Sequence, residues 1–323
     1  MHRRDFLKKG TAAAGLAASQ KMFTPLAKAG APAPPQAIPR RPLGKTGEKL
    51  SIIALGGIVV MNVEQTFANN IVAEAFDRGI NYFDVAPQYG NAQEHLGPAL
   101  EPFRKRSFLA CKTLMRDKEG AAKDLEDSLR KLRTDHVDLY QFHAVTTKED
   151  VAKIFGPAGA METFQAARQA GKVRFIGFSA HSVENAQSML EHYNFDTILF
   201  PINFVLFSQA NFGPQILKRA HEKGMGILAL KGMAKGAWAD AQKKDHPFPK
   251  CWYEPAALPD EASLALRWTL SKPITAAVPP GEEKYFRQAM DVAQHFQPLK
   301  PEEEKTLLAR ATGVTPIFHL GSA

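Results

Sequence analysis

The sequence predicts an α/β fold, a (β/α)8 TIM barrel formed by a single domain over residues 41–323, with an N-terminal hairpin and an extra C-terminal helix. Short apolar segments alternate with amphipathic helical segments along most of the chain, which is the pattern of parallel βα units. The 323 residues suffice for one such barrel, which usually needs about 250 residues. No G-x-G-x-x-G follows a predicted strand, which counts against a Rossmann domain.

Residues 1–29 have the three regions of an export signal. Arg3 and Arg4 lie in a basic start, residues 11–19 are weakly apolar, and Ala27-Lys28-Ala29 is an A-x-A cleavage site. This order is typical of a twin-arginine signal peptide, and a charged N-terminal arm is the alternative. We therefore expect a periplasmic protein, or one otherwise exported by the twin-arginine route, whose mature chain begins at Gly30.

The signal also accounts for much of the net charge. It holds six basic residues and one acid, so it contributes +5 to the chain's +8 and leaves +3 for the rest. That balance, with no basic stripe of interleaved aromatics, argues against nucleic acid as a partner. No run of about 20 apolar residues predicts a membrane anchor. A Pro- and Ala-rich linker covers residues 30–40.

The predicted elements follow in chain order. Residues 41–51 read as a hairpin that turns at Lys45-Thr46-Gly47. The segment 232–259 is long and irregular and leaves the end of a strand, so it is expected to overhang the active site. The predicted strands are 52–57, 80–84, 107–113, 137–143, 173–179, 197–200, 226–231 and 275–279, and the predicted helices are 66–77, 92–100, 121–132, 160–170, 183–192, 214–223, 260–271, 282–295 and 301–311.

Polar side chains end three successive predicted strands. Asp84, Lys112 and His143 each close or nearly close an otherwise apolar run, and Tyr89 lies in the loop five residues after Asp84. The C-terminal ends of barrel strands converge on one face, where active sites are built. A polar strand end, a turn tyrosine and a buried ion pair that only stabilises the barrel are the alternative reading. Buried ion pairs contribute little to stability, which favours function.

The segments FDVAPQYGNAQEHLG, the strand ending in CK, and DLYQFH together resemble the aldo-keto reductase superfamily. The resemblance implies that Asp84, Tyr89, Lys112 and His143 form that family's catalytic tetrad. Tyr89 would donate a proton, Lys112 would lower its pKa, and Asp84 would keep Lys112 charged. His143 would hydrogen-bond the substrate carbonyl. In the family the hairpin plugs the bottom of the barrel.

The same resemblance implies a nicotinamide cofactor, with NADP(H) favoured and NAD(H) possible. Two family contacts to the carboxamide are missing, because Ala180 stands where the family has Asn and Leu199 where it has Gln. The turn Pro279-Pro280-Gly281 resembles the family's phosphate-end turn. The positions that match cofactor-binding residues of the family are Ser179, Asn203, Gly281, Lys284 and Arg287, of which Arg287 would hold the 2′-phosphate.

The two cysteines, Cys111 and Cys251, lack the spacing of a zinc ribbon or an iron–sulfur cluster. Cys111 lies in a predicted buried strand, so we expect a small apolar side chain there rather than a disulfide. Asp138 and His143 differ by an odd number along one strand and point to opposite faces, so they are not expected to share a metal ion.

These observations favour an NAD(P)-dependent oxidoreductase that reduces an aldehyde or ketone to an alcohol, or catalyses the reverse. Its partners would be a small-molecule carbonyl or alcohol substrate and the twin-arginine export machinery. A barrel that binds a ligand or partner without turnover is the second hypothesis, and the two missing carboxamide contacts favour it. A hydrolase with paired carboxylates is the third, but only Asp84 fits one of its acids. The substrate and the oligomeric state stay open.

Overall fold

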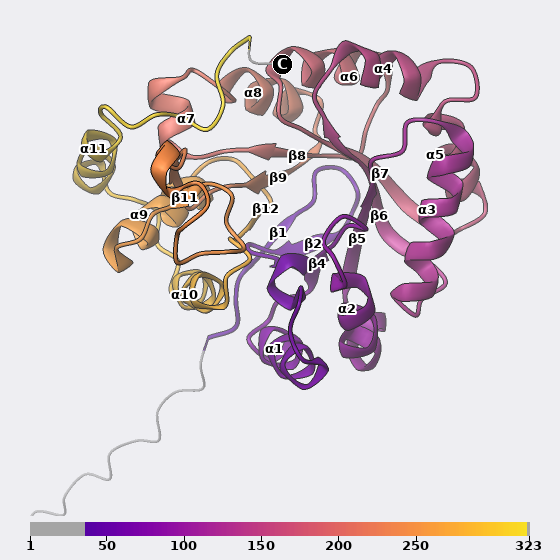
Figure 1. Cartoon of the computed structure of the whole chain (residues 1–323), viewed down its shortest axis with the longest axis horizontal. Helices are drawn as coiled ribbons and strands as arrows, with labels where there is room; N and C mark the ends of the chain where they lie inside the picture. Colours follow the sequence, from indigo (N-terminus) through magenta and orange to yellow (C-terminus); the bar gives the residue numbers. More distant parts are fainter. Residues whose placement is uncertain (1–35, 322–323) are drawn as a thin grey trace, which may run out of the picture. The chain divides into compact units, whose positions relative to one another are not determined.

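Eight parallel strands form one sheet in the computed structural model, which describes residues 36–321. Strands that follow one another around the barrel lie next to each other in the sheet, with helices around them (Figure 1). The two edge strands meet through one parallel bridge, in which Ala54 N donates to Ala277 O and Ala277 N to Ile52 O, both at 2.9 Å. The strands are β3 (Leu55–Gly56), β4 (Tyr82–Asp84), β5 (Phe108–Thr113), β6 (Val137–Val145), β7 (Val173–Ala180), β8 (Thr197–Pro201), β9 (Gly226–Leu230) and β12 (Ala276–Val278).

The predicted (β/α)8 barrel is therefore confirmed, and every predicted helix is present with ends that agree to within three residues. Gly79 and Gly171, with φ of 100° and 75°, lie two residues after the helices that finish at Asp77 and Gln169. The helices are α1 (Gln65–Asp77), α2 (Ala92–Leu100), α3 (Lys118–Lys131), α4 (Lys148–Phe155), α5 (Ala160–Gln169), α6 (Val183–His192), α7 (Phe204–Gln209), α8 (Pro214–Glu222), α9 (Pro259–Leu270), α10 (Glu283–Gln294) and α11 (Pro301–Arg310).

Some elements differ from the prediction for local reasons. Helix α3 begins three residues earlier than predicted, because the Asp117 side chain caps it by accepting from Gly120 N at 2.8 Å. Helix α9 is preceded by Leu258, which makes no side-chain cap, and Asp260 lies inside its first turn. The short helices α4 and α7 were not predicted, nor was the pairing of β10 (Ala234–Gly236) with β11 (Glu254–Pro255) in the long loop.

The N-terminal hairpin closes the end of the barrel at which the strands begin. It pairs β1 (Arg40–Pro42) with β2 (Lys49–Ser51), and Leu43 and Leu50 are fully buried in one cluster with inward-facing residues of the strands. Gly44 adopts a positive φ of 53°, and a Cβ there would lie 2.3 Å from Gly226 N. Only glycine fits this close approach. The hairpin leaves the opposite end, where the strands finish, available for a site.

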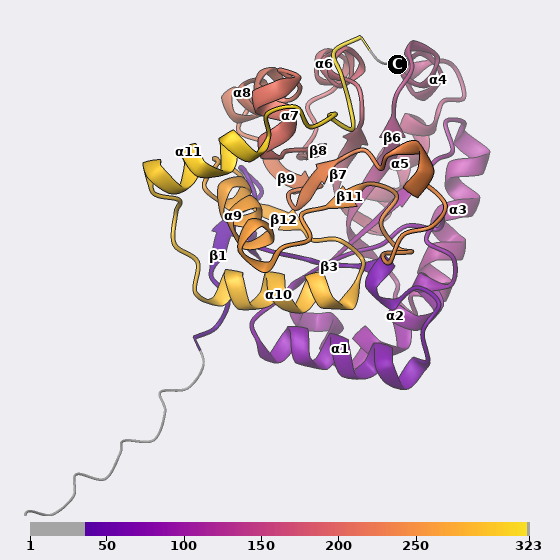
Figure 2. The same ribbon diagram turned by 60° about the vertical axis from the view of Figure 1, so that its left-hand side comes forward.

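The C-terminal part of the chain borders that opposite end. After α11 the chain returns past α7 and α8 in both views, drawn in yellow (Figures 1 and 2). Phe318 stacks on Phe212 at 5.4 Å between ring centroids, which fixes this segment to the barrel. The predicted signal peptide at 1–29 and most of the predicted linker lie outside the described residues. Within residues 36–321, no helix is long and apolar enough to cross a membrane.

Candidate active site

The structure brings the four predicted tetrad residues together at the C-terminal end of the barrel. Asp84 ends β4, Lys112 is the fifth residue of β5, and His143 lies near the end of β6. Tyr89 follows in the turn between β4 and α2, where its amide donates to Ala86 O at 3.1 Å. The three strands are neighbours in the sheet, so residues far apart in sequence face one space.

Asp84 and Lys112 form a direct ion pair whose side chains are only 3% and 1% exposed. The ammonium also donates to Val85 O at 3.3 Å. The other carboxylate oxygen of Asp84 accepts from Tyr82 Oη at 3.0 Å and from Gln141 Nε2 at 3.3 Å. Burial alone lowers the pKa of Lys112, but Asp84 and Tyr89 outweigh it and raise that pKa above its usual value. Lys112 is therefore a fixed, permanent cation.

Tyr89 lies beside this cation. The Lys112 ammonium is 5.1 Å from the centroid of the phenol ring, and the ring meets His143 edge-on at 5.8 Å. Burial raises the pKa of Tyr89 above 10, and the charge of Lys112 only partly offsets that rise while Asp84 adds to it. Lys112 therefore lowers the pKa of Tyr89, as expected, but desolvation is the larger effect and the net shift is upward.

His143 is a neutral imidazole at physiological pH. Burial lowers its pKa to about 2, and the charges of Lys112, Arg116 and Lys231 act in the same direction. Its Nδ1 lies 3.1 Å from Gln88 Oε1, so in this orientation of the amide Nδ1 donates and carries the hydrogen. A neutral imidazole has one donor and one acceptor nitrogen, so the orientation of this amide determines which nitrogen of His143 carries the hydrogen.

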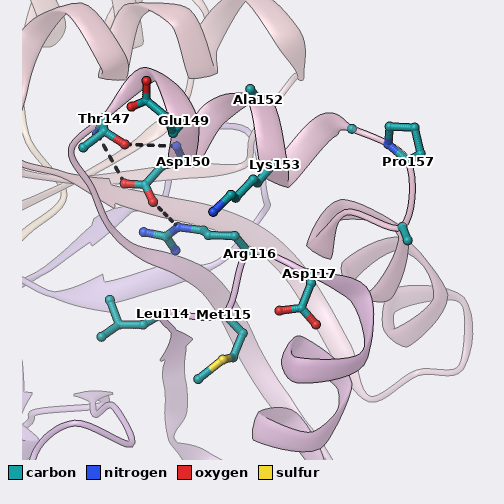
Figure 3. Close-up of a pocket in the computed structure, with 12 residues that line it drawn as sticks. Leu114, Met115, Arg116, Asp117, Thr147, Glu149, Asp150, Ala152, Lys153 and Pro157 are labelled. Atoms are coloured by element: carbon teal, nitrogen blue, oxygen red, sulfur yellow. Dashed lines mark hydrogen bonds and ion pairs between the residues drawn. The ribbon is translucent and has the colours of Figure 1, made fainter.

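Arg116 fixes the chain at the end of β6. Its guanidinium donates to His143 O at 2.7 Å and to Asp150 Oδ1 at 2.9 Å. Figure 3 shows this ion pair in a pocket between the end of β5 and α4, with Leu114 and Met115 on its other side. The next residue after His143, Ala144, has a positive φ of 51°, a strained conformation that needs such support. The pocket in Figure 3 contains no tetrad residue and borders the site.

Ser179, at the end of β7, can donate a hydrogen bond to the carboxamide of a nicotinamide. Its buried hydroxyl accepts a hydrogen bond from Ala144 N at 2.8 Å. The hydroxyl hydrogen is then free to donate to an amide oxygen. Asn203 is less available, because Oδ1 caps α7 by accepting from Leu206 N at 2.8 Å and Nδ2 donates to Lys231 O at 3.2 Å.

The predicted phosphate end lies at the start of α10. The residue before this helix, Glu282, makes no side-chain cap, so the first backbone N–H groups are open to an anion. Gly281 packs against Ile58 so closely that a Cβ would lie 2.2 Å from its Cγ2. Lys284 lies in the first turn, 5.9 Å from the Tyr285 ring centroid. The backbone at this end and the Ser179 hydroxyl thus fit a dinucleotide.

Arg287 has partners that the sequence did not predict. Its Nε donates to Glu283 at 2.8 Å and its Nη1 contacts Glu74 of α1 directly. These two carboxylates raise the pKa of Arg287, although partial burial opposes them. A 2′-phosphate at this position has to compete with at least one of the carboxylates for the guanidinium.

Part of the long loop folds back onto the phosphate end. Lys250 Nζ donates to Val59 O at 3.0 Å, and Lys250 N donates to Glu282 Oε1 at 2.6 Å. Phe248 packs on Tyr285 of α10 at 5.3 Å between ring centroids. The loop therefore lies over the end of the barrel at which the strands finish, as the sequence predicted.

A family comparison agrees with this geometry. The model of the aldo/keto reductase family matches residues 53–308. The chain belongs to the aldo/keto reductase family. The computed fold is similar to that of an aldo-keto reductase from Bacillus halodurans, with a TM-score of 0.67 and 21% identity, over 87% of this chain and 99% of that one.

Two of the relatives are named for the reactions that they catalyse. This aldo/keto reductase is 28% identical over 219 residues to the L-galactose dehydrogenase of Arabidopsis thaliana, which covers 61% of this chain and 66% of that protein. It is 27% identical over 253 residues to the NADPH-dependent alpha-keto amide reductase of Saccharomyces cerevisiae, with coverage of 72% and 80%. It spans just under two thirds of the length of the first two curated relatives that it matches.

Several site residues of this aldo/keto reductase were not found by sequence reasoning. Gln141 had a signal, since it interrupts the apolar run of β6 two residues before His143, on the same face. Lys231 had the same signal as Lys112, a lysine at the end of an apolar strand. Tyr82, Gln88 and Arg116 had none, because only their distances in space connect them to the tetrad.

The cysteines and histidines of this aldo/keto reductase do not suggest a second site. Cys111 and Cys251 are both buried and free, as expected for Cys111. Asp138 lies near the start of β6, where Arg104 and Arg174 bind its two oxygens at 3.0 and 2.6 Å, far along the strand from His143. Among the described residues, no group of three His, Cys, Asp or Glu side chains could hold a metal ion.

Proposed function

We propose that this protein reduces an aldehyde or ketone to an alcohol, or catalyses the reverse, with NADPH or NADH as the second substrate. The observation that carries the proposal is the buried Asp84–Lys112 ion pair beside Tyr89, at the end of the barrel where the strands finish. Binding alone needs no such arrangement. A permanent cation next to a phenol stabilises the phenolate that forms when the proton leaves.

Each residue has a separate part in the proposed reaction. A bound nicotinamide supplies the hydride. Tyr89 holds the proton that the substrate oxygen receives, Lys112 stabilises the remaining phenolate, and Asp84 holds Lys112 in place. His143 would donate from Nε2 to the carbonyl oxygen and orient it, which requires the Gln88 amide to turn so that its NH2 group faces Nδ1 in place of Oε1.

The assignment of the cofactor rests on the geometry and on one relative. Ser179 would donate to the carboxamide, and the backbone at Gly281 and the start of α10 would hold the phosphates, with Lys284 nearby. We favour NADP(H) because Arg287 supplies a guanidinium where a 2′-phosphate would lie, and because one relative is an NADPH-dependent reductase. NAD(H) stays possible, since Glu74 competes for that guanidinium.

Residues 1–29 support export by the twin-arginine route and a periplasmic location.

Two measurements on the full chain test the proposal. Titration with NADPH should quench protein fluorescence, and NADPH absorbance should then fall when an aldehyde is added. The relatives suggest sugar-type and α-keto carbonyls for the first panel. Binding of NADPH with no oxidation by any carbonyl would contradict the proposed turnover. No binding of either nucleotide would refute the proposal and favour the barrel that binds a ligand or partner without turnover, because the contacts missing at Ala180 and Leu199 would then have cost it the nicotinamide.

A further inference from the structure

Lys231 is a cation at the mouth of the barrel for which the proposed mechanism has no use. It directly follows β9, in the left-handed region with φ of 64°. A non-glycine residue in this region is strained and persists where its surroundings hold it, often at a functional site. Here Asn203 Nδ2 and Ala234 N both donate to Lys231 O, at 3.2 and 2.9 Å. The backbone therefore keeps the side chain at this mouth.

The Lys231 ammonium has aromatic neighbours but no counter-ion. Its Nζ lies 4.5 Å from the Trp252 ring centroid and 5.0 Å from that of Tyr253. Among residues 36–321 no hydrogen bond or ion pair of this ammonium is present, and no carboxylate affects its pKa, which burial lowers to about 8 while Cys251 acts in the opposite direction. Lys235, in the same loop, has its own acid, with Nζ 2.9 Å from Glu254 Oε1. Lys231 thus stays partly charged at neutral pH without a partner that neutralises it.

This cation faces the proposed catalytic space. Its charge lowers the pKa of both His143 and His181, in each case after the larger effect of burial. On the same side, Phe318 stacks on His181 at 5.0 Å between ring centroids and meets Trp252 at 5.9 Å. The mouth therefore has an aromatic wall, one unneutralised cation, and the tetrad histidine within reach of that cation's field.

We propose that Lys231 binds a carboxylate of the carbonyl substrate, whose apolar or planar body lies against Trp252 and Phe318. This inference rests on the proposed function and names the substrate class of the same site: an oxo acid or another carbonyl compound with a carboxylate. The aromatic faces hold the ammonium without neutralising it. A carboxylate that arrives desolvated gains a charge-assisted hydrogen bond, whereas a neutral isostere leaves the cation unpaired.

A pair of isosteric aldehydes tests this inference in the full chain. The wild type should reduce 4-carboxybenzaldehyde with a kcat/KM about 10- to 100-fold above that for 4-carbamoylbenzaldehyde, the range expected for one charge-assisted contact. Lys231→Met should bring the ratio of the two kcat/KM values to near one, and Lys231→Arg should restore part of it. Lys235→Met is the matched control and should keep the wild-type ratio, because Lys235 is already paired with Glu254.

A second readout needs no turnover. Benzoate should quench Trp252 fluorescence more strongly than benzamide, and Lys231→Met should weaken benzoate binding by about the same 10- to 100-fold. Trp252→Phe identifies the signal, since the chain has three tryptophans. Lys231-dependent benzoate binding without reduction of any aldehyde would support the carboxylate site and refute the proposed function.

Three results would overturn the carboxylate site and leave the reductase standing. One is equal or better reduction of the amide by the wild type. Another is an equal loss for both aldehydes in Lys231→Met, which would mark a structural role. The third is a fall in NADPH affinity in Lys231→Met with benzoate binding unchanged, because the anion at Lys231 would then be a cofactor phosphate.

Discussion

Removal of the Tyr89 hydroxyl is the most direct test of the proposed chemistry. Tyr89→Phe keeps the ring that packs edge-on against His143 and removes only the oxygen that would deliver the proton. Lys112 retains Asp84 and Val85 O as partners, so the ion pair and the fold should persist. General acid catalysis typically contributes about 10²–10⁴-fold, so kcat should fall at least about 100-fold, or about 2.7 kcal/mol in the activation barrier.

The assay is NADPH oxidation with an aldehyde that the wild type reduces, run beside NADPH fluorescence titration and a thermal melt. Cofactor affinity and the melting temperature should change little. Tyr140→Phe is the matched control, because that ring packs against Phe164 in the core, at 4.5 Å between centroids, and should leave kcat unchanged. More than about a tenth of the wild-type rate in Tyr89→Phe, with the control unaffected, would refute the proton-transfer role.

The remaining predictions concern the cofactor, export and pH. Arg287→Ala should weaken NADPH binding about 10-fold or more relative to NADH, and Glu74→Gln should do the opposite by freeing the guanidinium; equal effects on both nucleotides would remove the 2′-phosphate assignment. Replacement of Arg3 and Arg4 by Lys should leave precursor in the cytoplasm, and unchanged export would rule out the twin-arginine route. Reduction of an aldehyde without a carboxylate should be flat in kcat/KM around neutral pH, and alcohol oxidation should rise only at alkaline pH, because the pKa of Tyr89 is raised; an oxidation limb centred near pH 7 would contradict that direction.

Much of the barrel could be predicted because its elements are defined by local patterns. Short segments rich in apolar residues gave β5, β6 and β7, and glycines with positive φ mark the ends of several helices. The missed elements are short. Helix α7 has six residues and begins at an Asn203 cap, and β10 and β11 have three and two residues that are strands only because they pair across an 18-residue separation. Such pairing leaves no periodicity in the sequence.

The tetrad could be predicted for a different reason. A charged residue at the end of an apolar strand is costly unless the fold uses it, and three such residues on neighbouring strands identified the site. Their partners could not be found in this way. Gln88 and Arg116 lie in loops, where polar residues are ordinary, and only distance shows that they hold His143. The lowering of the Tyr89 pKa by Lys112 was predicted, but the larger rise from burial was not, because the sequence names its charged neighbours and not the extent of its burial.

The protonation states of the site bear on the direction of the proposed reaction. Lys112 is charged, His143 is neutral and Tyr89 is protonated at neutral pH, and burial contributes to the last two. Reduction needs a proton on the phenol and an uncharged imidazole that can orient a carbonyl, so every group starts in the required charge state, and only the Gln88 amide has to turn for His143 Nε2 to donate. Oxidation needs the phenolate, and a raised pKa makes that form rarer. The desolvation that raises the pKa of Tyr89 also strengthens the electrostatic stabilisation that Lys112 gives to the Tyr89 phenolate once the phenolate forms. Under the proposed function, the site is therefore better prepared to reduce a carbonyl than to oxidise an alcohol.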